Sequence, residues 1–163
     1  MNEDKKTSEM INGVEYAIET IGENEEKVLS YLIKLLGAYK LRHRPLDVIS
    51  DPNVPLHIEG MENTLVCPSL TVTLNGKTFP DWVIEVAGAD NAEMTYLVKT
   101  GIYREAGVNE YWIIDVDQNL IMVYNFKKNG LVPDIFRTPQ RIRVNTYKDL
   151  FISYSDLFRN KRG

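Results

Sequence analysis

The clearest pattern of apolar and polar residues lies between Pro80 and Asp115. It begins at residues 81–86, where two acidic residues and a valine alternate with larger apolar side chains, the period of a β-strand with two different faces. Apolar residues then recur at helical spacing over residues 91–106, and Gly107 stands where a helix ends easily. A second strand is predicted over residues 110–115. Two strands joined by a crossover helix of this length favour a parallel pair.

The remaining sequence predicts a hairpin, a long helix and several short strands. Asn12-Gly13 is a tight-turn dipeptide, so residues 9–18 are expected to form a β-hairpin. Acidic residues open a helix at Glu23, and its apolar face continues to about Lys40. A single strand is predicted over residues 65–74. Further short strands and turns are expected in residues 44–52, 120–126, 131–137 and 142–144, and Leu157 and Phe158 are expected to dock on the core.

This order of elements predicts the α/β or α+β class, with a mixed sheet and helices packed on it. The length of 163 residues fits one domain, residues 1–163, with a core that needs no disulfide. Residues 1–8 are polar and are expected to fray.

Composition and charge narrow the function classes. The 44% hydrophobic and 26% charged residues are ordinary values for a globular protein, and no apolar run approaches the roughly 18–20 residues that cross a bilayer. The first ten residues lack the apolar core of a signal peptide, so a cytoplasmic protein is expected. A net charge of −4 argues against wrapping nucleic acid over the whole surface, although Lys40–Arg44 or Arg141 with Arg143 can still form a local basic patch.

Cysteine and histidine usage excludes two kinds of site. Cys67 is the one cysteine, and it is expected to be a small buried residue without a disulfide partner. The two histidines have no ligand spacing, so a structural zinc site is excluded. No histidine is placed to activate Ser69, which excludes a hydrolase triad.

A carboxylate inside an apolar strand is the chemically suggestive feature. Glu85 faces the predicted helix that carries Lys99, and a charge buried there needs a partner. Most lysines are exposed, which is the alternative for Lys99, but its spacing of four residues from Tyr103 favours a position in a site. Asp90 can cap the same helix through its side-chain oxygen.

These motifs resemble the core of the Uma-two family of restriction endonucleases, part of the PD-(D/E)xK nuclease superfamily. The matching parts are PDWVIEV from Pro80, Lys99 with Tyr103, and GVNEYWIID from Gly107. The family pattern reads PDLVVEVLSPST, then a helix with Lys and Tyr four residues apart, then GVPEYWLVD. Glu9 opens a hairpin similar to the family's E-[LI]-I-D-G-V, so the resemblance covers nearly the whole chain. It implies a restriction-endonuclease-like mixed sheet flanked by helices, commonly in a homodimer, and a metal-dependent endonuclease that acts on DNA.

The resemblance also implies a site. Glu85 corresponds to the carboxylate that binds Mg²⁺ or Mn²⁺, and Lys99 corresponds to the lysine that orients water or stabilises the transition state. The family's second carboxylate corresponds to Ser69, a neutral residue here, so one anion of the pair is missing. Asp81 shares a strand face with Glu85 but lies about 13 Å along it, too far to share a metal. Glu9, Asp90 or Glu93 can supply the replacement oxygen, and Asp81 and Tyr103 are the other candidate site residues.

Two hypotheses remain open at this point. The first is a metal-dependent endonuclease that hydrolyses phosphodiesters with Glu85, Lys99 and a substitute second ligand. The second is a catalytically inactive relative that acts as a DNA-binding or dimerising module. A pure protein-interaction domain, as a third class, would bind neither metal nor nucleic acid.

Overall fold

A six-stranded mixed sheet is built around the two strands that the sequence predicts most clearly. The computed structural model describes residues 8–18, 21–88 and 94–159. Strands β7 (Trp82–Ala87) and β8 (Glu110–Asp115) are parallel, with Trp82 opposite Glu110, and all their residues are buried. The other pairs in this sheet are antiparallel, in the order β10-β9-β8-β7-β6-β3. The predicted mixed sheet and parallel pair are confirmed.

The other elements are short apart from one helix. The strands of the central sheet not yet named are β3 (Val48–Ile49), β6 (Leu70–Thr73), β9 (Leu120–Asn125) and β10 (Asp134–Phe136). A second sheet, in the order β2-β1-β5-β4, contains β1 (Ser8–Ile11), β2 (Val14–Ala17), β4 (Leu56–His57) and β5 (Leu65–Val66). The third sheet pairs β11 (Arg141–Arg143) with β12 (Phe151–Ser153). The helices are α1 (Glu23–His43), a π-helix η1 (Met94–Lys99), α2 (Thr100–Glu105), α3 (Phe126–Asn129) and α4 (Tyr154–Arg159).

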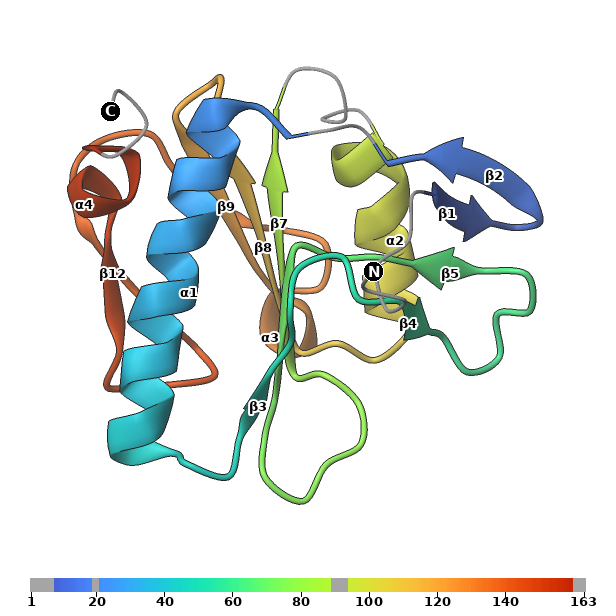
Figure 1. The fold of residues 1–163 in the computed structure, drawn as a ribbon, viewed down its shortest axis with the longest axis horizontal. Helices are drawn as coiled ribbons and strands as arrows, with labels where there is room; N and C mark the ends of the chain where they lie inside the picture. Colours follow the sequence, from blue (N-terminus) through green and yellow to red (C-terminus); the bar gives the residue numbers. More distant parts are fainter. Residues whose placement is uncertain (1–7, 19–20, 89–93, 160–163) are drawn as a thin grey trace.

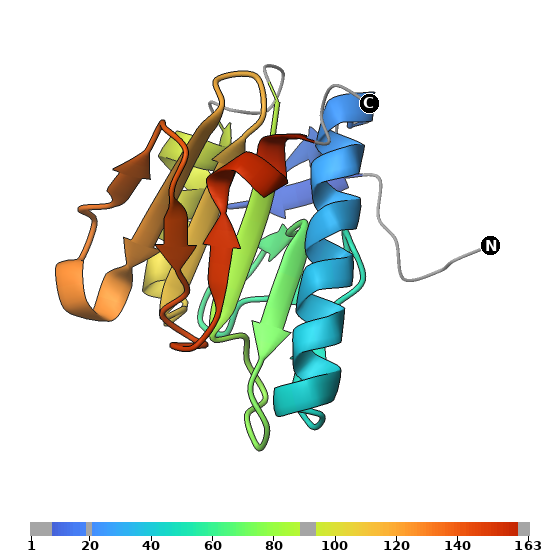
Figure 2. The same cartoon turned by 90° about the vertical axis from the view of Figure 1, so that its left-hand side faces the viewer.

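The central sheet has a different layer on each face, and each layer forms its own apolar core. Helix α1 covers one face, and the π-helix η1 with α2 and the β1–β2 hairpin covers the other (Figure 1). The turned view shows β12 and α4 beside α1 (Figure 2). Because side chains alternate along β7, Ile84 packs toward α1 while Val83 and Glu85 face the hairpin and α2. The chain is therefore a single mixed α+β domain, as its sequence predicts.

Two predicted elements were wrong in detail. The single strand expected over residues 65–74 is two strands in different sheets, because Pro68 has no N–H to continue a ladder and instead accepts a hydrogen bond from Asn53 N. The helix expected over residues 91–106 is described from Met94 and begins as a π-helix. Gly107 follows it with φ of 90°, as its place after the helix predicts.

Several other predictions are confirmed with small shifts. The hairpin turns at Asn12-Gly13, and α1 begins at Glu23 but runs three residues beyond Lys40. The strand expected to reach Phe126 ends at Asn125, where the asparagine side chain caps α3. Leu157 and Phe158 are buried in α4 and belong to the apolar core on the α1 side, as expected. Ser8 begins β1, and residues 1–7 lie outside the described part of the chain.

Glu110 joins the central sheet to the segment that connects β11 and β12 of the third sheet. Its carboxylate is almost fully buried and accepts hydrogen bonds from Trp112 Nε1 at 2.7 Å, from the backbone and side-chain nitrogens of Asn145, and from Thr146 N and Oγ1 at 2.7 Å each. These donors are neutral groups, so hydrogen bonds replace the water that the carboxylate loses on burial.

We expect Glu110→Ala to lower the free energy of unfolding by about 3 kcal/mol, because it leaves several buried donors without an acceptor. Urea unfolding followed by tryptophan fluorescence measures this loss. Glu105→Ala, at an exposed position of α2, is the control and should change stability by less than about 0.5 kcal/mol. Equal losses in the two variants would contradict the bracing role of Glu110.

Candidate active site

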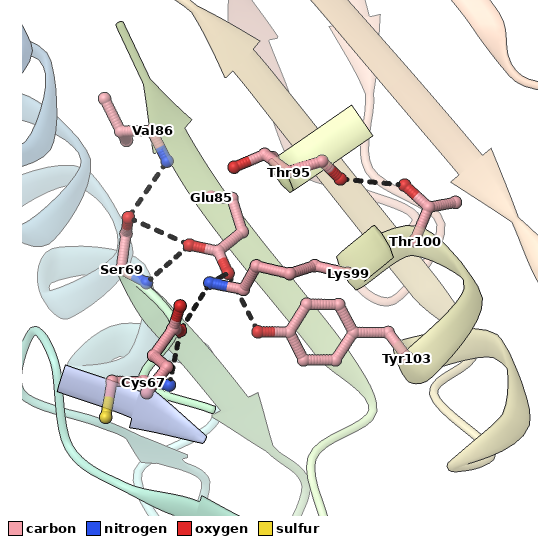
Figure 3. A network of polar contacts seen from close by, with 9 residues as sticks. Cys67, Ser69, Glu85, Val86, Thr95, Lys99, Thr100 and Tyr103 are labelled. Atoms are coloured by element: carbon pink, nitrogen blue, oxygen red, sulfur yellow. Dashed lines mark hydrogen bonds and ion pairs between the residues drawn. The ribbon is translucent and has the colours of Figure 1, made fainter. Parts of the chain in front are cut away.

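Four polar side chains from four separate elements meet on the hairpin side of the central sheet. Glu85 extends from β7, Lys99 ends η1, Tyr103 lies in α2, and Glu9 comes from β1. Figure 3 shows Lys99 and Tyr103 reaching toward the Glu85 carboxylate, with Ser69 on the other side of it. The exposed fraction is 8% for Glu9, 5% for Glu85, 5% for Lys99 and zero for Tyr103, so the cluster is nearly closed to water.

Lys99 is bonded to both carboxylates of this cluster. Its Nζ lies 2.7 Å from Glu9 Oε1 and forms a second ion pair with Glu85 Oε2. The Tyr103 hydroxyl donates to the same Glu85 oxygen at 2.8 Å. The Cys67 N–H donates to Glu9 Oε1 at 2.8 Å, which fixes the hairpin carboxylate against the loop between the two sheets.

Local backbone geometry explains why the helix supplies two groups to one carboxylate. Lys99 ends the π-helix and Tyr103 follows four residues later in α2, so both lie on the same side of the helix. The wider π turn lets Thr100 Oγ1 donate to the Thr95 carbonyl at 3.2 Å. π-turns of this kind are frequent at functional sites.

Ser69 lies beside Glu85, at the position where the family resemblance expects a second carboxylate. Its N–H is 3.3 Å from Glu85 Oε1 and its Oγ is 3.5 Å from the same oxygen. The Oγ also accepts from Val86 N at 2.9 Å, which takes the place of a ladder hydrogen bond just before β6 begins. Ser69 is half-buried, so a larger polar side chain here would still reach Glu85.

Asp81, another candidate from the sequence, does not join the cluster. It lies at the start of β7, where it pairs with Lys77 Nζ at 2.7 Å and accepts from Leu74 N and Asn109 Nδ2. It holds turns together at the far end of the strand from the site. Asp90, with its expected capping role, and Glu93 lie outside the described residues.

Glu9 was one of several residues that the sequence offered in place of the missing second carboxylate, and the sequence alone did not distinguish it from the others. The signal was the alternation in β1, where Glu9 and Ile11 are buried while Met10 between them is exposed. An acidic residue at an inward-facing hairpin position requires a partner. Which partner it finds depends on how the hairpin docks, which its local sequence does not specify.

The buried charges shift the pKa values of their neighbours. Burial raises the pKa of Glu85 above its ordinary value of 4.5, and Glu9 adds to this rise, while Lys99 and Tyr103 oppose it without cancelling it. Burial by itself would lower the pKa of Lys99, but the charges of Glu85 and Glu9 outweigh burial and raise it. Burial, with the Glu85 charge, raises the pKa of Tyr103 well above 10, so Tyr103 remains a neutral hydrogen-bond donor.

The donor set fits a hard divalent cation that keeps water or phosphate ligands. Two carboxylates converge on one point, and among the described residues Glu9 Oε2 accepts no hydrogen bond. Mg²⁺ commonly binds one or two protein carboxylates and completes its shell with water and substrate phosphates. In the part of the chain that the structure describes, no group of three or more His, Cys, Asp or Glu residues could hold a metal.

Comparison with known proteins identifies the family. The sequence profile of the Uma2 family, described as “Putative restriction endonuclease”, matches residues 1–151, and the chain belongs to this family. A comparison with curated proteins found no match. A solved crystal structure described as “a putative nuclease belonging to DUF820” from Anabaena variabilis ATCC 29413 has a TM-score of 0.77, with 17% identity over 94% of this chain and 90% of that chain. At this identity the likeness establishes the shared fold, and the resemblance expected from the motifs is confirmed.

We expect Glu85→Gln to flatten the dependence of stability on pH. Because the pKa of Glu85 is raised in the folded protein, the folded state binds this proton more tightly than the unfolded state does, and the wild type loses stability as pH rises above 4.5. Urea unfolding from about pH 4 to about pH 8 measures the slope. Glu15→Gln, at an exposed position of β2, should keep the wild-type slope, and an unchanged slope in Glu85→Gln would contradict the raised pKa.

Proposed function

We propose that this chain is an endonuclease that hydrolyses phosphodiester bonds, with Glu9, Glu85 and Lys99 as its catalytic centre. The observation that carries the proposal is the convergence of two buried carboxylates from β1 and β7 on one buried lysine. Clusters of buried ionisable groups are costly to keep, and they are found at functional sites more often than elsewhere. Membership in a family described as restriction endonucleases supports a nucleic-acid substrate, and DNA is the proposed one.

A divalent cation, Mg²⁺ or Mn²⁺, would be held by Glu85 and Glu9, and when bound it would supply charge neutralisation at the scissile phosphate and an activated water. Tyr103 holds one oxygen of Glu85 through its hydrogen bond and so fixes the direction of the carboxylate. Lys99 keeps its proton, because its pKa is raised, and its ammonium can stabilise the negative charge that develops on the phosphate.

A second candidate is a catalytically inactive relative that binds DNA or dimerises. It is favoured by one observation: Ser69, beside Glu85, is neutral, while Lys99 already pairs with both carboxylates. Such a site is stable without a metal. Dimerisation remains part of both candidates and is a proposal for this chain. Within the described residues, no helix has both the length and the apolar character needed to cross a membrane.

Nicking of supercoiled plasmid DNA in the presence of Mg²⁺ or Mn²⁺ tests the proposal. We expect activity in the wild type and a loss of at least about 100-fold in Glu85→Gln and in Lys99→Met, because each removes a group that stabilises charge in the transition state. Glu15→Gln and Lys77→Met are matched controls, since both residues lie outside the cluster and Lys77 pairs with a different acid, Asp81. Nicking that persists in Glu85→Gln would contradict the assigned centre, and an inactive but folded wild type would favour the second candidate.

A further inference from the structure

The two carboxylates of the site are already paired with one cation, the Lys99 ammonium. Glu9 and Glu85 carry two formal negative charges, and among residues 8–18, 21–88 and 94–159 the one ammonium that contacts them is Lys99 Nζ. The side chains of all three are at most 10% exposed, so solvent screens their interactions poorly. Leaving or adding a charge in such a place is costly. The closed cluster without a metal therefore carries one net negative charge, because Lys99 offsets one of its two carboxylates.

A divalent cation would neutralise the two glutamates by itself. If Lys99 stayed between them, the site would gain a net positive charge, and two cations would compete for the same oxygens. Lys99 Nζ already contacts Glu9 Oε1 and Glu85 Oε2, so a metal that lay between the two carboxylates and used these oxygens would have to share them with Lys99. The metal and the Lys99 ammonium are thus alternative partners of the same carboxylates.

We propose that Lys99 is the resident counter-cation of the metal-free site, and that a divalent metal binds only when Lys99 withdraws from at least one glutamate. This inference rests on the proposed metal-dependent function. It assigns Lys99 a second role, because the ammonium released from the carboxylates becomes available to contact the substrate phosphate. Metal entry and the presentation of Lys99 to substrate are then one event.

Because Ser69 is neutral, the site has no third carboxylate at this position to balance a divalent metal and the Lys99 ammonium together. Ser69 contacts Glu85 Oε1 through its N–H and Oγ, so an aspartate at this position would add a third negative charge directly beside Glu85. Three carboxylates would balance a divalent metal and an ammonium together. In Ser69→Asp, Lys99 could therefore remain in place when metal binds, whereas in the wild type it could not.

Calorimetric titration with Mn²⁺ tests the competition. We expect Lys99→Met to bind Mn²⁺ at least about tenfold more tightly than the wild type, because the competing cation is gone. In the Ser69→Asp background the same Lys99→Met change should tighten binding much less. Lys77→Met, which removes a lysine paired with Asp81, should leave the Mn²⁺ affinity unchanged. Equal Mn²⁺ affinity in the wild type and Lys99→Met would overturn the inference.

Reductive methylation of the wild type, read by mass spectrometry of the Lys99 peptide, tests the same exchange without a substitution. Lys99 should be protected without metal, while Lys77, with 54% of its side chain exposed, is modified in both conditions. Saturating Mn²⁺ should raise the rate at Lys99 severalfold in the wild type and leave it low in Ser69→Asp. Bound Mn²⁺ with an unchanged rate at Lys99 would overturn the inference while the proposed function stands. Failure of the wild type, Lys99→Met and Ser69→Asp all to bind Mn²⁺, with the proteins folded, would instead overturn the metal-dependent function and the inference that rests on it.

Discussion

The ion triad of Glu9, Lys99 and Glu85 is the interaction on which the site and one layer of the fold both depend. It joins a hairpin, the central sheet and a helix, and two of its members are 90 residues apart in sequence. Each charge is buried, so each requires the others, and loss of one partner from such a group typically costs about 3–5 kcal/mol. The hairpin is also attached by the pairing of β1 with β5 and by hydrogen bonds from its turn, but of the four residues of β1 only Glu9 and Ile11 are buried. The same charges that would act on a phosphate therefore help to hold the layer in place.

Sequence patterns predicted the parts of the fold that are specified locally. Strand β8 was predicted to the residue, because its six residues are bounded by a helix-ending glycine and a turn, and because a crossover helix of this length requires a parallel neighbour. The strand over residues 65–74 failed for a physical reason. Both halves alternate correctly, but alternation does not reveal which sheet a strand joins, and Pro68 was the one indication of the change. The π-helix was equally hidden, since a single wide turn leaves apolar spacing almost unaltered over six residues.

The candidate site also combines residues that local sequence patterns predict with residues whose position depends on tertiary structure. Glu85, Lys99 and Tyr103 were accessible from the sequence, because a carboxylate on an inward strand face and two groups four residues apart on a helix are local patterns. Glu9 was not selected over its alternatives, because its approach depends on tertiary docking of the hairpin. The family resemblance placed Ser69 next to Glu85. In the structure it is held there by a hydrogen bond from Val86 N to the Ser69 side chain, which no sequence periodicity indicates. The buried state of Lys99 runs against the usual exposure of lysine and follows from its two acidic partners.

Because Glu9 lies in the first strand, the order of synthesis determines when the site can form. During synthesis Glu9 leaves the ribosome long before Lys99, so the hairpin can form its turn early but cannot neutralise its inward-facing carboxylate until Lys99 follows, after β3, β6 and β7 of the central sheet. Long-range pairings of this kind form late, because the loop that they close is costly. A nascent chain therefore cannot acquire the complete site before the π-helix has been synthesised and has docked. Shorter translation intermediates would carry the hairpin without its partner lysine, so the cluster proposed as the catalytic centre would be incomplete in them.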